Sequence, residues 1–217
     1  MLLLFAASNN NLDDRNVESS GHHPTTYNFQ NPRLQGAIEM YNEGLNLFQN
    51  GNYDDAIDTF MTGIFSGRST VQKLVEEEQH EQQESNKDDS DNDVDNPQEA
   101  LDWLVTSYIM CCRSRILKDG DYTKARADAW AACSYSQNMN LGALTMMLVV
   151  CENTDDKIGE LQTLKTIKQT ILDDTMELSL PSVAVTKEEK FTSASLASIE
   201  KLQERIQELD DELFPKK

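Results

Sequence analysis

Histidine is the side chain most often used as a general base near neutral pH, and this 217-residue sequence has three of them. His22, His23 and His80 all lie in segments that are not expected to pack firmly, so none is well placed beside a nucleophile. The sequence has no glycine-rich phosphate loop, no G-x-S-x-G motif and no H-E-x-x-H motif. We therefore predict that the protein is not an enzyme, has no catalytic residues and uses no cofactor.

One acidic stretch has the spacing of a metal-binding loop. Asp88, Ser90 and Asn92 place oxygen donors at alternate positions, and Glu99 stands at the twelfth place, as in a calcium loop. Such a loop needs glycine at its sixth place, where this sequence has Asp93. We expect weak, non-specific cation association there and no specific metal site.

The four cysteines are Cys111, Cys112, Cys133 and Cys151. They form no C-x-x-C pair, and no histidine stands at metal-ligand spacing from them. Each lies in an apolar segment with helical periodicity, where cysteine behaves as a small apolar residue. We predict four buried free thiols, which are typical of a reducing compartment.

The charge balance excludes one class of partner. The 38 acidic and 19 basic residues give a net charge of −19, so binding to the phosphates of a nucleic acid is not expected. No stretch approaches the roughly 20 apolar residues of a membrane span, and the apolar run 1–7 lacks the basic region of a signal peptide. We expect a soluble cytoplasmic protein that contacts no membrane, with the nucleus as the alternative compartment.

Composition divides the chain into parts. Residues 1–32 are polar without periodicity and predict a disordered arm, whereas 33–178 predict a helical domain. Within that domain, 84–96 have one apolar residue and are expected to be a disordered acidic insertion. Residues 179–192 are predicted to be a linker, and 193–217 a C-terminal helix.

Helical periodicity of apolar residues is clear between 34 and 172. We predict that the second helix ends near Ser66-Gly67 and that helix resumes or continues from Ser69. Pro97 suits the first turn of the next helix. The predicted helices are 34–48, 53–65, 69–83, 97–118, 122–133, 141–151 and 157–172.

A pattern of small and bulky residues occurs twice. Its first copy has Gly51, Tyr53, Ala56, Phe60 and Gly63, and its second has Gly120, Tyr122, Ala125 and Ala132. Ala129 stands where Phe60 stood, and the neighbouring Trp130 is expected to supply the missing bulk. A fainter third copy starts at Thr154, 34 residues after Gly120.

A 34-residue helix-turn-helix unit with these signature positions resembles the tetratricopeptide repeat. The resemblance implies an all-α, right-handed superhelix of about three helical hairpins plus a C-terminal helix. It also implies that the first helix of each hairpin lines a groove for a partner protein or peptide, although the same apolar residues also suit burial by a neighbouring helix. The implied groove residues are Tyr41, Leu45, Phe48, Met110, Ser114, Leu117, Leu144 and Leu148.

The resulting functional hypothesis is a non-enzymatic adaptor or scaffold that holds a protein partner in an apolar groove. The alternative is an acidic chaperone of basic proteins such as histones, acting through 84–96. A further hypothesis is that this insertion folds back on the one basic cluster of the chain. The cluster is Arg113, Arg115, Lys118, Lys124 and Arg126.

The C-terminal helix has the leucine and isoleucine spacing of a short coiled coil. From Ile199 to Leu213 the apolar intervals are 3, 4, 3 and 4, a seam of only about two heptads. It is predicted either to cover the end of the helical stack or to pair weakly with a second copy, so the protein is a monomer or a weak homodimer.

Overall fold

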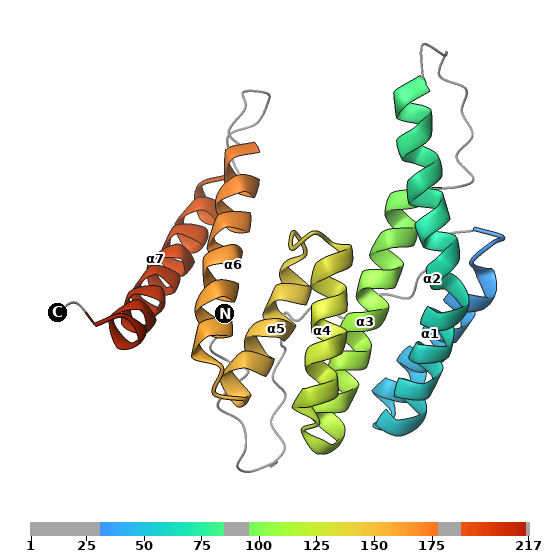
Figure 1. Cartoon of the computed structure of the whole chain (residues 1–217), viewed down its shortest axis with the longest axis horizontal. Coiled ribbons are helices and arrows are strands. Elements are labelled where there is room, and N and C mark those ends of the chain that lie inside the picture. The colour runs from blue at the N-terminus through green and yellow to red at the C-terminus, as the bar shows by residue number, and fades with distance from the viewer. Residues whose placement is uncertain (1–30, 85–95, 178–187, 216–217) are drawn as a thin grey trace.

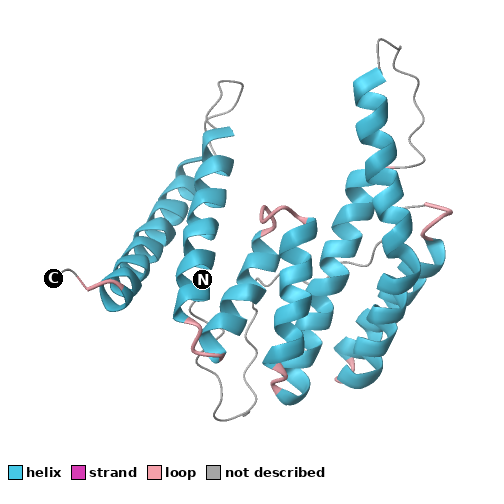
Figure 2. Ribbon diagram, viewed as in Figure 1, coloured by secondary structure: helices cyan, strands magenta, loops and turns pink. Residues whose placement is uncertain are grey.

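The computed structural model of this chain describes residues 31–84, 96–177 and 188–215 (Figure 1). All regular structure in these ranges is helical, with no strand (Figure 2), which confirms the predicted all-α class. The described helices are α1 (Gln35–Gln49), α2 (Tyr53–Glu84), α3 (Pro97–Asp119), α4 (Tyr122–Tyr135), α5 (Leu141–Asn153), α6 (Lys157–Glu177) and α7 (Glu188–Leu213).

The helix ends follow local sequence signals. Gly51 and Gly120 have left-handed φ angles of 76° and 64°, which glycine adopts without strain, and they close α1 and α3. Asn96 caps α3 by accepting hydrogen bonds from the backbone N–H groups of Gln98 and Glu99, and Pro97 occupies the first turn. These turns lie where the sequence predicts them.

The helices pack in series, each against the next along the chain. In addition, α1 contacts α3 and α3 contacts α5, so the first helices of successive hairpins touch one another. Figure 1 shows the resulting row of antiparallel helices from α1 to α7. One apolar cluster extends from Leu34 in the turn before α1 to Leu209 on α7.

Small residues allow the first two helices to approach closely. A Cβ atom added at Gly44 would lie 2.7 Å from the ring of Phe60, and one added at Gly63 would lie 3.0 Å from the carbonyl oxygen of Ala37. Gly44 and Gly63 therefore allow α1 and α2 to pack closely.

Of the two alternatives beyond Ser66-Gly67, a helix that resumes or one that continues, the structure shows the second, because α2 is continuous from Tyr53 to Glu84. The predicted end near Ser66-Gly67 is therefore wrong. Gly67 is a contact point and not a helix stop: a Cβ atom there would lie 2.7 Å from the ring of Trp103. Beyond it, Val71 and Leu74 are buried in the same core as Trp103. Tertiary packing therefore overrides the local tendency of Ser66-Gly67 to end the helix.

Trp130 does not fill the core position that Phe60 occupies in the first copy of the pattern and Ala129 occupies in the second. Its side chain is 65% exposed, whereas Ala129 is fully buried with Cys112, Ala125 and Val150 in a second, smaller cluster. Successive side chains of a helix are about 100° apart, so a residue next to a core position cannot fill the same space.

The C-terminal helix α7 packs on α6 and buries Leu202 and Leu209. It begins at Glu188, within the predicted linker 179–192. The predictions for most of the arm 1–32, for the insertion 84–96 and for the start of the linker lie outside the described residues. Of these segments, the structure places Glu84 at the end of α2 and Asn96 at the cap of α3.

The close contact at Gly67 predicts a strong response to substitution. Gly67→Val should lower the free energy of unfolding by about 3 kcal/mol, because the added atoms overlap the ring of Trp103. The matched control is Gly36→Val in α1, where an added Cβ meets nothing within 4 Å. We expect the control to change stability by less than about 0.5 kcal/mol, since valine and glycine have similar helix propensities. Urea unfolding of both variants measures the difference, and equal stability would contradict the packing.

Candidate functional site

Most of the groove residues implied by the family resemblance lie in the core. Leu117 is 53% exposed and Phe48 is half-buried, whereas the other six are buried. These six are covered because α1, α3 and α5 are packed between neighbouring helices. The buried six are Tyr41, Leu45, Met110, Ser114, Leu144 and Leu148. An open apolar groove along the first helices is therefore not formed by these side chains.

The basic cluster is engaged within the described helices. Four of its members form ion pairs with acidic residues of the described helices and turns. The fifth, Arg113, has its guanidinium 5.5 Å from the ring centre of Phe48. The pairs are Arg115–Asp128, Lys118–Asp54, Lys124–Asp121 and Arg126–Asp156. These basic side chains therefore have partners among the described residues, and the predicted fold-back of 84–96 lies outside those residues.

A groove of about 680 Å³ lies between α4 and α6, and α5 forms its floor. Its α4 wall includes Thr123, Arg126, Ala127, Trp130 and Ser134. The floor includes Leu144, Met147 and Cys151, which are spaced three and four residues apart and therefore share one face of α5. The remaining lining residues are Cys133, Asn138, Asp156, Gly159, Gln162, Thr163 and Thr166.

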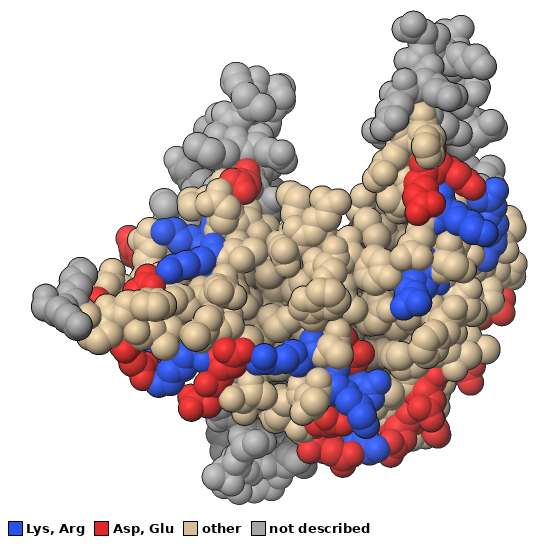
Figure 3. All heavy atoms as spheres, in the orientation of Figure 1, with Lys and Arg blue, Asp and Glu red and all other residues tan. Residues whose placement is uncertain are grey.

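The groove differs from the predicted one in its position. It lies between the second helices of two hairpins, and Leu144 is the one predicted groove residue that borders it. Figure 3 shows that the surface across the middle of this face carries few charged side chains. Below it lies a line of blue and red side chains.

Trp130 is the most unusual residue of the groove. A tryptophan with 65% of its surface exposed keeps a large apolar ring in water, where no described helix covers it. The other tryptophan, Trp103, is fully buried. Trp130 therefore has the size and exposure of an interface anchor.

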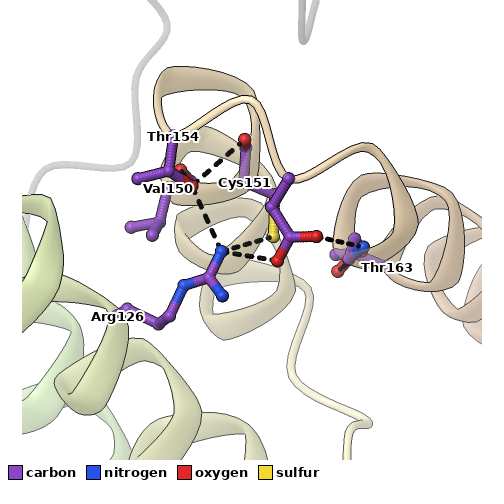
Figure 4. A network of polar contacts seen from close by, with 7 residues as sticks. Arg126, Val150, Cys151, Thr154 and Thr163 are labelled. Carbon is purple, nitrogen blue, oxygen red and sulfur yellow. Dashed lines mark hydrogen bonds and ion pairs between the residues drawn. The ribbon is translucent and has the colours of Figure 1, made fainter.

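One end of the groove is held by a polar network centred on Arg126 (Figure 4). The Nη2 group of Arg126 donates to Asp156 at 2.6 Å and to the hydroxyl of Thr154 at 3.1 Å. Asp156 also accepts the backbone N–H of Gly159 at 2.9 Å and so caps the start of α6. The network joins α4 to the turn between α5 and α6.

The electrostatics of this network follow from its geometry. The Gly159 backbone N–H, followed by Arg126, lowers the pKa of Asp156 below its ordinary value of 3.8. Burial raises the pKa of the Cys133 thiol to about 11 and also raises that of Cys151. All four cysteines are buried free thiols, as predicted. Both thiols that line the groove are therefore protonated and weakly reactive near neutral pH.

The other end of the groove is formed by the turn between α4 and α5. Gln137 and Asn138 have left-handed φ angles of 52° and 63°. The backbone N–H of Asn138 donates to the carbonyl of Cys133 at 2.7 Å, and the Thr170 hydroxyl donates to the Asn138 carbonyl at 3.4 Å. The first bond closes the turn, and the second connects it to α6, although the Thr170 hydroxyl also donates to the Thr166 carbonyl at 3.1 Å. Asn138 lines the groove at this turn.

Within the described ranges, no group of three or more His, Cys, Asp or Glu side chains could hold a metal ion. None of the described helices is long and apolar enough to cross a membrane.

Comparison with protein-family models, with curated proteins and with solved structures found no match to this chain. The tetratricopeptide resemblance therefore rests on the sequence pattern alone.

Sequence reasoning missed the groove because it assigned Trp130 to the core. The available signal was the helical period of α4, in which Ala125, Ala129 and Ala132 mark the buried face and Trp130 falls beside it.

The Asp156 cap should make a pH-dependent contribution to stability. Because its pKa is lowered in the folded state, this contribution is present above the ordinary pKa of 3.8 and is lost as pH falls through the folded value. Asp156→Asn keeps a capping side chain and loses the ion pair, which should cost about 0.5–1 kcal/mol at pH 7. Asp156→Ala also loses the cap and should cost about 1–2 kcal/mol.

Urea unfolding at pH 7 and pH 2.5 tests this assignment. The difference between wild type and Asp156→Asn should shrink toward zero at the lower pH, since the other acids titrate alike in both proteins. A difference that stays constant with pH would rule out a stabilising charge at Asp156.

Proposed function

We propose that this protein is a non-enzymatic scaffold that binds a segment of a partner protein. The observation that carries the proposal is the open groove over α5 with the exposed ring of Trp130 on its wall. Grooves between packed helices are a recurring site of peptide recognition, and exposed tryptophan is enriched among residues that dominate binding energy.

The proposal includes a tetratricopeptide-like, right-handed superhelix of three hairpins, α1–α2, α3–α4 and α5–α6, with α7 covering the last. Its support is the repeated glycine, tyrosine and alanine positions. The contacts of α1 with α3 and of α3 with α5 are compatible with such a stack. In a helical-repeat stack each unit buries its face against the next, so a terminal helix such as α7 is expected to cover the open end.

A monomer fits this arrangement better than a homodimer. The apolar seam of α7 is used within the chain, because Leu202 and Leu209 are buried in the core and Ile206 packs against it. Three ion pairs also join α6 to α7. These pairs are Lys157–Glu212, Lys165–Asp210 and Arg205–Glu160.

Quantitative affinity capture from cell extract tests the scaffold proposal. Trp130→Ala should reduce recovery of a specific partner at least tenfold, because it removes the largest exposed apolar group of the groove. The matched control is Phe65→Ala on α2, since Phe65 is 68% exposed and does not line the groove. Equal recovery with both variants would show that the groove does not bind the captured proteins.

A second candidate function is the chaperoning of basic proteins such as histones. It is favoured by the position of α2, whose C-terminal end projects from the body of the molecule (Figure 1). The run Glu76–Glu78 is exposed there and leads toward the acidic residues of 84–96. A projecting acidic segment attracts basic proteins over about a Debye length.

This second function predicts a steep dependence on salt. Changing the five aspartates between 88 and 95 to asparagine should weaken binding to core histones about tenfold or more at low salt. The difference in histone binding between the wild type and this variant should disappear near 0.5 M salt. The control is Trp130→Ala, which leaves the acidic segment unchanged and should bind histones as the wild type does. If the aspartate variant also binds histones as the wild type does, this second function is excluded.

A further inference from the structure

The geometry points to an uncharged, extended segment of a partner protein as the occupant of the groove over α5, with one large apolar side chain held against Trp130. This inference rests on the proposed scaffold function and adds the chemistry of the partner. It follows from the charges, the hydrogen-bonding groups and the apolar floor of the groove.

The lining carries no net charge. Of its side chains, only Arg126 and Asp156 are charged, and they are paired with each other at 2.6 Å. This neutrality is unusual for a chain with a net charge of −19. A charged side chain that entered the groove would lose water without meeting an opposite charge that is free to pair with it.

Four charged residues of α4 and α6 that do not line the groove are also paired. On α4, Asp128 pairs with Arg115 of α3, and Lys124 pairs with Asp121. On α6, Glu160 and Lys165 pair with Arg205 and Asp210 of α7. Asp128, Glu160 and Lys165 are thus paired with residues of α3 and α7, which do not line the groove.

The polar groups of the groove suit peptide N–H and C=O groups. Ser134, Asn138 and Gln162 line it, and within the described chain their side chains have no hydrogen-bond partner. Amide and hydroxyl side chains both donate and accept, so they match the uncharged groups of an extended backbone. Thr163 and Thr166 donate to carbonyls of their own helix, which leaves their oxygen atoms as acceptors.

The floor suits a large apolar side chain. Met147 is half-buried on the floor between the two walls, Leu144 is buried beside it, and Trp130 stands at the edge. Methionine adapts its shape to an inserted group, and the indole ring offers a wide apolar face.

The length of the groove sets the length of the segment. Eleven positions separate Thr123 from Ser134 along the α4 wall, which corresponds to about 16 Å at about 1.5 Å per residue. An extended chain advances about 3.3 Å per residue, so about five residues of the partner would lie in the groove.

The test is selection from a display library of random 12-residue peptides against the full chain, with parallel selections against Trp130→Ala and Phe65→Ala. We expect peptides that contain a large apolar residue and few charged residues. Their recovery should fall at least tenfold on Trp130→Ala and stay unchanged on Phe65→Ala. The two exposed-residue variants should fold normally, which circular dichroism can verify.

Binding of the selected peptides to the wild type can then be followed by tryptophan fluorescence. Trp103 is fully buried, so a shift in emission or reduced quenching by acrylamide reports on Trp130. Trp130→Phe serves as the control that should lose this signal.

Three outcomes decide the inference. Trp130-dependent peptides that are poor in charge support it. Trp130-dependent peptides rich in Lys and Arg, or in Asp and Glu, overturn the partner chemistry and leave the scaffold function standing. If no selected peptide depends on Trp130 for binding, the proposed uncharged segment is not the occupant of the groove. The affinity capture described above then decides separately whether the groove binds any protein.

Discussion

The contact between Trp103 and Gly67 is the constraint on which the first half of the structure depends. The indole ring of α3 occupies the space that a side chain at Gly67 would fill, and a Cβ atom there would also lie 3.0 Å from Ala37 of α1. Gly67 therefore lies where α1, α2 and α3 meet. Because large apolar residues of these three helices belong to one core, the long helix α2 stays continuous through a glycine that would otherwise favour an end.

The second half of the stack is held in a different way. The fully buried members of its second cluster, Ala125, Ala129, Cys112 and Val150, are small or compact, and larger side chains pack only at its edge. The buried pair of Arg115 and Asp128 joins α3 to α4 beside this cluster. Burial raises the pKa of Asp128 although the Arg115 bond opposes the shift, so desolvation works against the ionised carboxylate and the bond to Arg115 compensates for only part of it.

This change in packing explains where the groove lies. A helix with a narrow buried face of alanines leaves its larger residues, Arg126 and Trp130, outside the core. Helix α6 packs against α7 through apolar residues and ion pairs, and the space between α4 and α6 is open above α5. The groove thus lies beside a helix whose buried face is made of small residues.

Several features follow from the sequence by itself, because they depend on neighbouring residues. The all-helical class, the turns at Gly51 and Gly120, the cap before Pro97 and the burial of the four cysteines all follow from periodicity and local capping chemistry. Tertiary structure alone decided that α2 continues past Gly67, that Trp130 faces solvent and that the basic residues are paired. These features depend on which helix faces which, and residues distant in the chain, such as Trp103 for Gly67 and Asp156 for Arg126, determine that.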